Sequence, residues 1–510
     1  MSDPALSGES VGIVGAGIGG LAAAAHLADA GADVTIYEKQ PQVGGVAGVI
    51  EEDGFRFDTG PSWYLMPGLF ERFFEQFGYQ PEELYDLVRL DPHYRIFWTD
   101  GDSVDIPANT DRAVELFESY EDGAGEAFEA YLEESAETYE IGMERFVVPN
   151  RSRFRDYLSA DVAKSARGLS LLGTMDDHVA EYFDNPKLRQ IVQYTLVFLG
   201  GAPHNTPALY NLMSHVDFEL GVYYPQGGMY AVVEAMESVC EELGVEINTS
   251  TRVMGLEPVE SGVAVAHDGD TRAHDRVVCN APIAHAERKL LPDHAVDRDP
   301  EYWEHRTYAP SAYMCYLGVD GPLESLEHHT LVLPTDWDDH FHSIFEAPGW
   351  PDDPAYYVNV PSRTDPTAAP EGKETVVVLV PIAPDLDDDE AARERMRADV
   401  LDSLAEHAGV DLRGRIEFER EMCVSDYREQ FNKPQGTALG LAHTLFQTGP
   451  MRPSHRAPGV DRLYYVGGDA NPGIGVPMCL LSGEHVTETI IEDATGSGFV
   501  DSVLPEQLRP

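Results

Sequence analysis

Short apolar runs alternate with glycine-rich turns at the start of the chain. Residues 11–14 (VGIV) form an apolar run with the length of a buried strand. The Ala-rich segment 21–30 follows a turn with the spacing G-x-G-x-x-G and is typical of a helix that ends at Gly31. A second strand is expected over residues 33–37, directly before Glu38. This order predicts a strand–helix–strand unit.

Each glycine of that turn has its own physical task in a dinucleotide-binding unit. Gly15 permits the tight turn, Gly17 lets the backbone approach a pyrophosphate, and Gly20 lets the helix pack closely on the strand. The free N–H groups at the helix N-terminus favour phosphate binding. Glu38 is placed to accept hydrogen bonds from a ribose 2′-hydroxyl and would repel a 2′-phosphate, which argues against NADP.

Two further glycine motifs distinguish between the dinucleotides. Gly44-Gly45 would bring the backbone close to the same cofactor, and Asp58-Thr59-Gly60-Pro61 marks another tight approach. NAD sites do not need these additions, whereas an extended FAD would need several backbone approaches. The sequence therefore favours FAD.

A second strand–turn–helix pattern lies near the other end of the chain. Residues 463–466 are apolar and run into Gly467-Gly468-Asp469, and a helix is expected over about 477–491, where proline suits the first turn. The strand would bring Asp469 to the ribityl or pyrophosphate side of the cofactor. The helix N-terminus, after Gly475 and Val476, would then point at the flavin ring.

These motifs resemble those of the phytoene-desaturase-like flavoproteins, within the wider group that includes amine oxidases and protoporphyrinogen oxidase. The turn YYPQGGM at 223–229, before a helix, is similar to the carotenoid desaturases at the matching place. The resemblance covers nearly the whole chain, from Val11 to about Ile491. It implies an enzyme that inserts double bonds into long isoprenoid chains with FAD as the electron acceptor.

The resemblance also bears on single cofactor contacts. In the family, a valine at the place of Val253 touches the adenine ring through its backbone. Val46 departs from the pattern, since many relatives have an arginine there that helps hold the cofactor. The expected cofactor contacts are Gly15, Gly17, Gly20, Glu38, Lys39, Gly45, Val46, Gly60, Pro61, Val253, Asp469, Gly475, Val476 and Pro477.

The chain is too long for one core, so two domains are expected. We predict an α/β fold with a discontinuous, Rossmann-like FAD-binding domain of the GR2 or amine-oxidase type, formed by residues 1–75, 226–290 and 430–497. An inserted α+β substrate domain, associated with the membrane, would comprise residues 76–225 and 291–429, and residues 498–510 would form a tail. Residues 263–267 and 274–280 are expected to pair as a hairpin, and 311–318 and 375–381 to be strands of a mixed sheet.

Two apolar segments are candidates for contact with a lipid substrate or a membrane. Residues 69–77 place a leucine and four phenylalanines on one helical face, and residues 188–199 form one of the longest apolar stretches. The alternative for both segments is a helix of the protein core. Neither is long enough to span a bilayer.

Charge sets this chain apart from most proteins. It carries 89 acidic and 35 basic residues, a net charge of −54. This balance excludes a general nucleic-acid binder, which needs a basic face. It suggests a highly saline cytoplasm, because at molar salt the Debye length is about 3 Å and repulsion among the carboxylates is screened.

Cysteine and histidine usage gives no sign of a metal site. None of the five cysteines forms a C-x-x-C pair, which fits a reduced cytosolic compartment without a disulfide framework. His328, His329, His340 and His342 cluster in the sequence but lack a recognisable ligand spacing. The N-terminus lacks the features of a signal peptide, so we expect a cytoplasmic protein.

The family resemblance implies a membrane-dissolved carotenoid substrate and a peripheral contact with the cytoplasmic membrane. Because salt-adapted archaea make fifty-carbon carotenoids, two steps suit the sequence: desaturation of phytoene toward lycopene, or a later 3,4-desaturation of a hydroxylated lycopene derivative on the way to bacterioruberin. The Val46 departure favours the later step. A flavin-dependent carotenoid isomerase, an amine-oxidase-like enzyme and a non-catalytic carotenoid-binding protein remain alternatives. The sequence identifies neither a catalytic side chain, a proton acceptor nor the oligomeric state.

Overall fold

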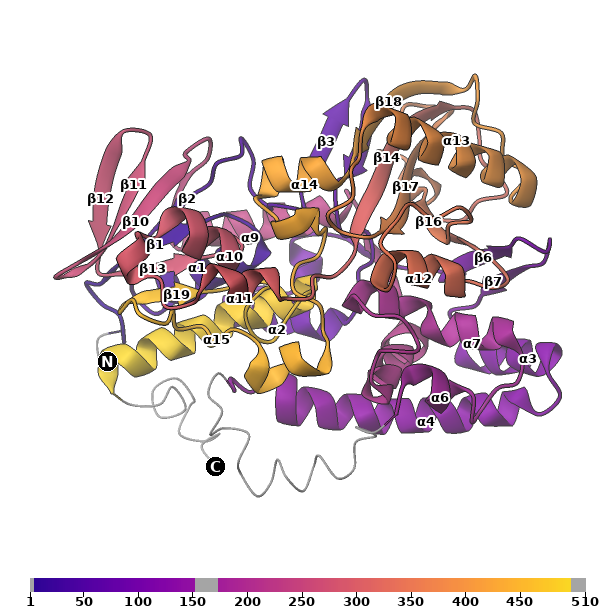
Figure 1. Ribbon diagram of the computed structural model, residues 1–510, viewed down its shortest axis with the longest axis horizontal. Coiled ribbons are helices and arrows are strands. Elements are labelled where there is room, and N and C mark those ends of the chain that lie inside the picture. Colours follow the sequence, from indigo (N-terminus) through magenta and orange to yellow (C-terminus); the bar gives the residue numbers. More distant parts are fainter. Residues whose placement is uncertain (1–3, 152–172, 497–510) are drawn as a thin grey trace.

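The computed structural model describes residues 4–151 and 173–496 of this protein (Figure 1). Its first layer is a parallel sheet of five strands in the order β19-β13-β1-β2-β9. These strands are β19 (Leu463–Tyr465), β13 (Arg276–Cys279), β1 (Ser10–Val14), β2 (Asp33–Tyr37) and β9 (Glu246–Asn248). All five come from residues 1–75, 226–290 and 430–497, so the sheet gathers distant parts of the chain. The predicted α/β fold with a Rossmann-like sheet is confirmed.

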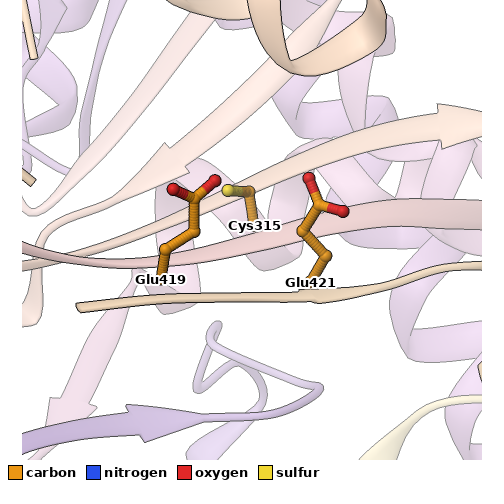
Figure 2. Close-up of side chains that lie close together, drawn as sticks. All are labelled: Cys315, Glu419 and Glu421. Atoms are coloured by element: carbon orange, nitrogen blue, oxygen red, sulfur yellow. The ribbon is translucent and has the colours of Figure 1, made fainter. Parts of the chain in front are cut away.

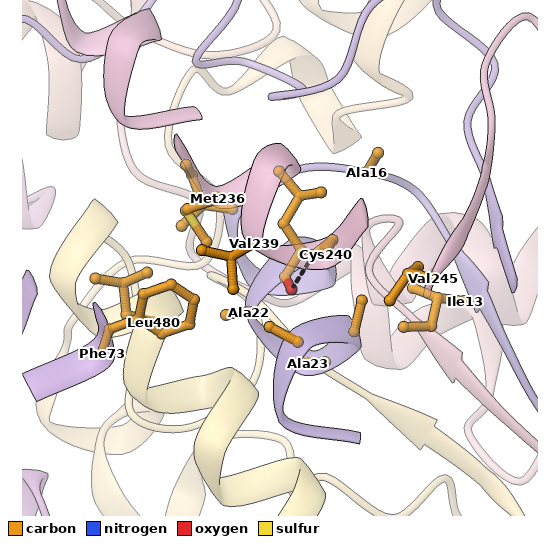
Figure 3. Packing of buried hydrophobic residues seen from close by; sticks show 14 of the residues in the cluster. Ile13, Ala16, Ala22, Ala23, Phe73, Met236, Val239, Cys240, Val245 and Leu480 are labelled. Atoms are coloured by element: carbon orange, nitrogen blue, oxygen red, sulfur yellow. Dashed lines mark hydrogen bonds between the residues drawn. The ribbon is translucent and has the colours of Figure 1, made fainter. Parts of the chain in front are cut away.

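Several helices surround this sheet, and α1 packs closely on two of them because the facing side chains there are small. They are α1 (Ile18–Asp29), α9 (Met229–Glu242), α15 (Val476–Thr495) and α2 (Pro67–Gln76). A Cβ on Gly483 of α15 would come within 2.5 Å of the Cβ of Ala22 on α1. On another side of α1, the thiol of Cys240 donates to the carbonyl of Leu21 at 3.4 Å (Figure 3). The small side chains of the Ala-rich helix α1 thus allow it to pack closely against two helices and the sheet.

The meander that follows α9 and β9 corrects one prediction. It consists of β10 (Val253–Val259), β11 (Gly262–His267) and β12 (Asp270–His274), joined in antiparallel order. The partner of β11 across the 268–269 turn is therefore 270–274, not 274–280 as predicted. Residues 276–279 instead pair with β1 in parallel. All four are buried, and the apolar run Val277-Val278-Cys279 is typical of a parallel strand.

A second, mixed sheet has seven strands in the order β18-β14-β17-β16-β15-β6-β7. Its strands are β6 (Tyr94–Trp98), β7 (Ser103–Ile106), β14 (Ser311–Asp320), β15 (His329–Leu333), β16 (Tyr356–Asn359), β17 (Lys373–Ile382) and β18 (Ile416–Met422). Only the β15–β6 pair is parallel. Helix α13 (Glu390–His407) packs its buried residues into the same core cluster as β14 and β17. The expected strands at 311–318 and 375–381 are present and pair with each other.

Helices near β6 and β7 form a further core. They are α3 (Thr110–Tyr120), α4 (Ala124–Gly142), α6 (Met175–Val179), α7 (Pro186–Gln193) and α8 (Leu212–Ser214). Further short strands and α-helices are β3 (Val49–Glu52), β4 (Phe55–Asp58), β5 (Leu87–Arg89), β8 (Tyr223–Pro225), α10 (Ile283–His285), α11 (Pro300–Glu304), α12 (Asp338–Phe345) and α14 (Val424–Phe431). In the described ranges no helix has both the length and the apolar character needed to cross a bilayer.

The two apolar segments proposed for lipid contact belong to the core. On α2, Leu69, Phe70, Phe73 and Phe74 are at most 8% exposed. Phe73 and Phe77 pack around His26 of α1. In the second segment, the described residues from Leu188 to Leu196 are buried apart from Arg189. The described side chains of both segments are therefore mostly buried, whereas those of residues 198 and 199 lie outside the described ones. A sequence pattern predicts that a helix has an apolar face but does not show what covers that face.

Candidate flavin site

The two ends of the chain meet at the carboxyl edge of the parallel sheet. Strand β13 lies between β1 and β19, so the turns that follow β1 and β19 are neighbours. A Cβ on Gly19, in the first turn of α1, would lie 2.8 Å from the Cα of Gly467. The amide of Gly467 donates to the hydroxyl of Ser482 on α15 at 3.0 Å. The glycine-rich turn and the C-terminal turn therefore form one surface, at the edge where open α/β sheets bind ligands.

Side chains are excluded from the glycine-rich turn by close backbone contacts. Gly15 has a φ of +99°, which favours glycine. A Cβ on Gly20 would overlap the carbonyl oxygen of Gly15, and a Cβ on Gly17 would lie 2.9 Å from the Nδ2 of Asn280. Asn280 also donates to the carbonyl of Gly15 at 3.4 Å. Sequence reasoning missed this asparagine, although a polar residue directly after the buried strand β13 was a usable signal.

The loop from Gly44 to Pro61 folds against this turn. The amide of Gly44 donates to the carbonyl of Ala16 at 2.8 Å, and a Cβ on Gly45 would lie 3.2 Å from the Cα of Gly17. A Cβ on Gly60 would overlap the carbonyl of Val46. The loop therefore brings Gly45 against the glycine-rich turn, and Val46 packs against Gly60, which precedes Pro61 in the chain.

Charged side chains gather where β2 ends. Glu38 is 5% exposed, and its carboxylate accepts hydrogen bonds from the amides of Ala16 and Gln40, both at 2.7 Å. Burial lowers the pKa of Lys39 to about 8, helped by the charge of Arg252, while Glu38 opposes the shift. Val253 begins β10 beside Arg252 and is half-buried. The structure thus places Glu38, Lys39 and Val253 in one neighbourhood, and adds Arg252, which the sequence reading missed.

Asp469 joins the loops on the other side of the site. It is 8% exposed, and its carboxylate accepts hydrogen bonds from the amides of Ile283 and Leu441, both at 3.2 Å. A Cβ on Gly440 would lie 2.8 Å from its Oδ1. The aspartate is therefore fixed by the protein at the end of β19.

The guanidinium of Arg452 completes this arrangement. It donates to main-chain carbonyls in four places, namely Leu441, Gln447, Gly468 and Ala470, at 2.5 to 3.2 Å. Burial lowers the pKa of Arg452 to about 10, while the nearby charge of Asp469 raises it. One carboxylate and one guanidinium thus bind the C-terminal loops together.

Two helix N-termini at the site lack side-chain caps. Helix α1 begins after Gly17 and α15 after Gly475, and neither has a capping side chain or an acidic residue in its first turn. Gly475 is exposed, and Val476 and Pro477 are half-buried. Free N–H groups and the positive dipole end favour an anion in both places. With the close glycine contacts, these termini fit a dinucleotide that places a pyrophosphate at α1 and an electron-rich ring at α15.

Metal-ligating side chains approach one another outside this site. In the described part of the chain, Cys315 on β14 lies beside Glu419 and Glu421 on β18 (Figure 2). Arg397 pairs with Glu419, and the hydroxyl of Tyr313 donates to Glu421 at 2.5 Å. Burial raises the pKa of the Cys315 thiol well above its usual range, which disfavours the thiolate that a metal needs. In this cluster Glu419 is therefore engaged in an ion pair with Arg397, and Glu421 in a hydrogen bond with Tyr313.

The four clustered histidines also have separate partners. Hydrogen bonds join His328 to Thr364 at 2.7 Å, His329 to Tyr357 at 2.6 Å and His342 to Glu346 at 2.8 Å. The Nε2 of His340 bonds the carbonyl of Pro381, also at 2.8 Å. They do not converge on a common point.

The comparisons with known proteins agree with this geometry. Residues 18–491 match the family described as flavin containing amine oxidoreductase. The chain is 58% identical, over 97% of its length and 100% of the relative, to a carotenoid 3,4-desaturase of Haloarcula japonica. It is 34% identical to a zeta-carotene-forming phytoene desaturase of Myxococcus xanthus, over 96% of this chain and 95% of that one.

Solved structures share the fold at low sequence identity. An oxidoreductase from Methanosarcina mazei superposes with a TM-score of 0.63 and 18% identity, over 94% of this chain and 100% of that one. A putrescine oxidase variant gives a TM-score of 0.62 and 17% identity, over 95% and 99% of the two chains.

Proposed function

Because the chain belongs to the flavin containing amine oxidoreductase family, we propose that it is an FAD-dependent carotenoid desaturase. Its proposed reaction is the 3,4-desaturation of a hydroxylated lycopene derivative on the way to bacterioruberin. The observation that carries this proposal is the 58% identity to the haloarchaeal 3,4-desaturase, which extends over that whole relative and 97% of this chain. Phytoene desaturation is the second candidate, supported by relatives such as the one from Myxococcus xanthus at 34% identity.

The proposed reaction removes two hydrogen atoms from neighbouring carbons and releases two electrons and two protons in total. When bound, FAD supplies the acceptor for the two electrons. The chain contributes binding and orientation. The backbone at Gly15, Gly17 and Gly20 would hold the pyrophosphate, and Glu38 the adenosine ribose. The N-terminus of α15, beginning at Val476, would face the ring and favour negative charge there by about 0.3–1 kcal/mol.

The proposal also includes where the enzyme works. A long polyene dissolves in the bilayer, so the protein would work in peripheral contact with the cytoplasmic membrane. The net charge of −54 supports a salt-adapted cytoplasm as its environment.

The test is to incubate the purified, FAD-loaded protein with hydroxylated lycopene derivatives and, separately, with phytoene. Extracted products are then compared by chromatography and by the absorption of their polyene. We expect a longer chromophore from the hydroxylated derivative and no change in phytoene. Conversion of phytoene alone would favour the second candidate, and conversion of neither substrate would refute desaturation.

A further inference from the structure

Two long segments of this acidic chain contain no acidic residue. Aspartate and glutamate make up 89 of 510 residues, yet none occurs between Asp184 and Asp217 or between Glu429 and Asp461. At the average frequency, each of these segments would carry between five and six. The next longest such segment, residues 10–28, belongs to the buried nucleotide-binding unit. The described part of the first segment is mostly buried, so the lack of carboxylates bears on the surface chiefly in the second segment.

The two acid-free segments meet in space. Together they line a cavity of about 40 Å³, with Gly201 and Thr206 from the first segment and His443 and Thr444 from the second. The hydroxyl of Tyr210 forms a hydrogen bond to the Nδ1 of His443 at 3.2 Å across the same boundary. They make one continuous region of the molecule, although more than 200 residues separate them in sequence.

Large apolar side chains protrude from the second segment. Phe446 is 78% exposed and Met451 is 49% exposed, and both lie in short 3-10 turns, at 445–447 and 449–451. In the described part of the chain only two other large apolar side chains are comparably exposed, Met254 and Val259, and both lie on β10. We call residues 444–451 the apolar turn.

Hydrogen bonds of buried polar side chains hold the apolar turn in place. The side chain of Gln447 is buried and accepts a hydrogen bond from the amide of Thr307 at 3.0 Å, while its own amide donates to the carbonyl of Thr307 at 2.8 Å. The guanidinium of Arg452 bonds the carbonyl of Gln447 at 3.2 Å. Buried polar groups thus fix the base from which Phe446 and Met451 project, so their exposure is a property of the fold.

The region behind the apolar turn reaches the flavin site. The Nε2 of His443 accepts a hydrogen bond from the amide of Ile474 at 3.2 Å. A Cβ on Gly473 would overlap the ring of the same histidine. His443 therefore connects the cavity to the residues just before α15, whose N-terminus is assigned to the flavin ring.

We propose that the apolar turn is the surface by which this protein docks on a lipid bilayer, with Phe446 and Met451 entering the interface. This inference rests on the proposed function, which requires a membrane-dissolved substrate. Carboxylates at such a surface would be desolvated and repelled by anionic lipids, and residues 430–460, which carry the apolar turn, contain none. Exposed aromatic and apolar side chains on a fixed base are the groups that enter an interface.

The test uses flotation with vesicles of phosphatidylcholine and phosphatidylglycerol in molar KCl, where long-range charge effects are screened. The double variant Phe446→Ser, Met451→Ser is compared with Met254→Ser, because Met254 is 63% exposed but lies on the meander. We expect wild type and Met254→Ser to float with the vesicles, and the double variant to lose at least about tenfold in binding. No flotation of wild type, equal flotation of all three, or an equal loss in both variants would overturn the proposal.

Further measurements distinguish failure of the docking proposal from failure of the proposed function on which it rests. With detergent-dispersed carotenoid, the double variant should keep wild-type activity, because the turn acts in docking and not in the reaction. If wild type itself fails to desaturate, the proposed function fails, while the vesicle comparison still decides the docking surface.

Light scattering tests whether a second copy of the chain, and not a bilayer, covers the apolar turn. Loss of a dimer in the double variant, with vesicle binding unchanged, would overturn lipid docking.

Discussion

Single atoms decide which residues the nucleotide-binding turn accepts. At Gly20 the space for a Cβ is taken by the carbonyl of Gly15, whereas Gly68 on α2 has open space in the same position. Both glycines lie in the first turn of a helix, at α1 and α2, so they differ in their surroundings more than in their backbone. Alanine substitutions at these two glycines therefore separate the effect of adding a methyl group to a first helical turn from the effect of that methyl group's contact with neighbouring atoms.

We predict that Gly20→Ala lowers stability by about 1–3 kcal/mol through overpacking and reduces the flavin content of the purified protein. Gly68→Ala should be neutral or raise stability by up to about 1 kcal/mol, because alanine is the better helix former. Thermal unfolding and flavin absorbance measure both. Equal stability and flavin content in the two variants would show that the predicted contact at Gly20 is absent.

Asp217 is a carboxyl group whose protonation the fold controls. The hydroxyls of Tyr94 and Tyr194 donate to its Oδ2 at 2.8 and 3.2 Å, and the Nδ1 of His93 lies 4.0 Å from its Oδ1. Burial raises the pKa of Asp217 to about 7, while the two hydroxyls oppose the shift. Burial also lowers the pKa of His93 to about 4, so this histidine supplies no positive charge near neutral pH.

This geometry predicts a pH-dependent stability. The folded protein keeps the Asp217 proton up to about pH 7, whereas the unfolded chain releases it near 3.8. Stability from this group is therefore complete below the unfolded pKa and is lost as pH rises to 7, at about 1.4 kcal/mol per pKa unit. Asp217→Asn cannot ionise, so its stability relative to wild type should rise between pH 4 and 7. Denaturant unfolding at several pH values measures this, and a constant difference would contradict it.

At the scale of elements, the site depends on loops that follow strands. Asp469 follows β19 and bonds the amides of Ile283 and Leu441, which belong to two other loops. Asp389 performs a comparable task far from the site, since its side chain accepts a hydrogen bond from the amide of Ala392 at the start of α13. The two aspartates offer a matched comparison of a loop anchor at the site and a helix cap elsewhere.

Asp469→Ala should lower flavin content while the protein remains folded. Its loss leaves two buried N–H groups unpaired, at about 1–3 kcal/mol each, in loops that would line the cofactor. Asp389→Ala should cost about 1 kcal/mol for the lost cap and leave flavin content unchanged. Flavin absorbance per protein and the melting temperature report both effects. Unchanged flavin occupancy in Asp469→Ala would remove this residue from the site.

Local signals explain how far the sequence could predict these elements. The run 11–14, the glycine turn and the run 463–466 each combine a short apolar strand with a turn, so both halves of the site were predictable. Strand β12 (DTRAH) was not, because four of its five residues are exposed and it lacks an apolar face. The roles of Asn280 and Arg452 depend on contacts with distant loops, which no local pattern contains.

At the scale of the whole molecule, the net negative charge is the main influence on how stability depends on salt. With a net charge of −54, repulsion among carboxylates opposes the compact state unless salt screens it. We predict that the melting temperature rises steadily between about 0.1 M and about 1 M KCl, as the Debye length falls from about 10 Å to about 3 Å. Sucrose at equal osmolality should not replace the salt. A melting curve and flavin content that do not change in dilute buffer would refute salt adaptation.

The central proposal is that the two ends of the chain form a flavin site that oxidises a carotenoid. The most direct measurement is an anaerobic single turnover of the FAD-loaded protein with a hydroxylated lycopene derivative, followed by absorption spectroscopy. The account predicts that the flavin band bleaches in proportion to the double bonds formed, while the polyene absorption moves to longer wavelength. A flavin that stays oxidised while the polyene is unchanged would contradict it.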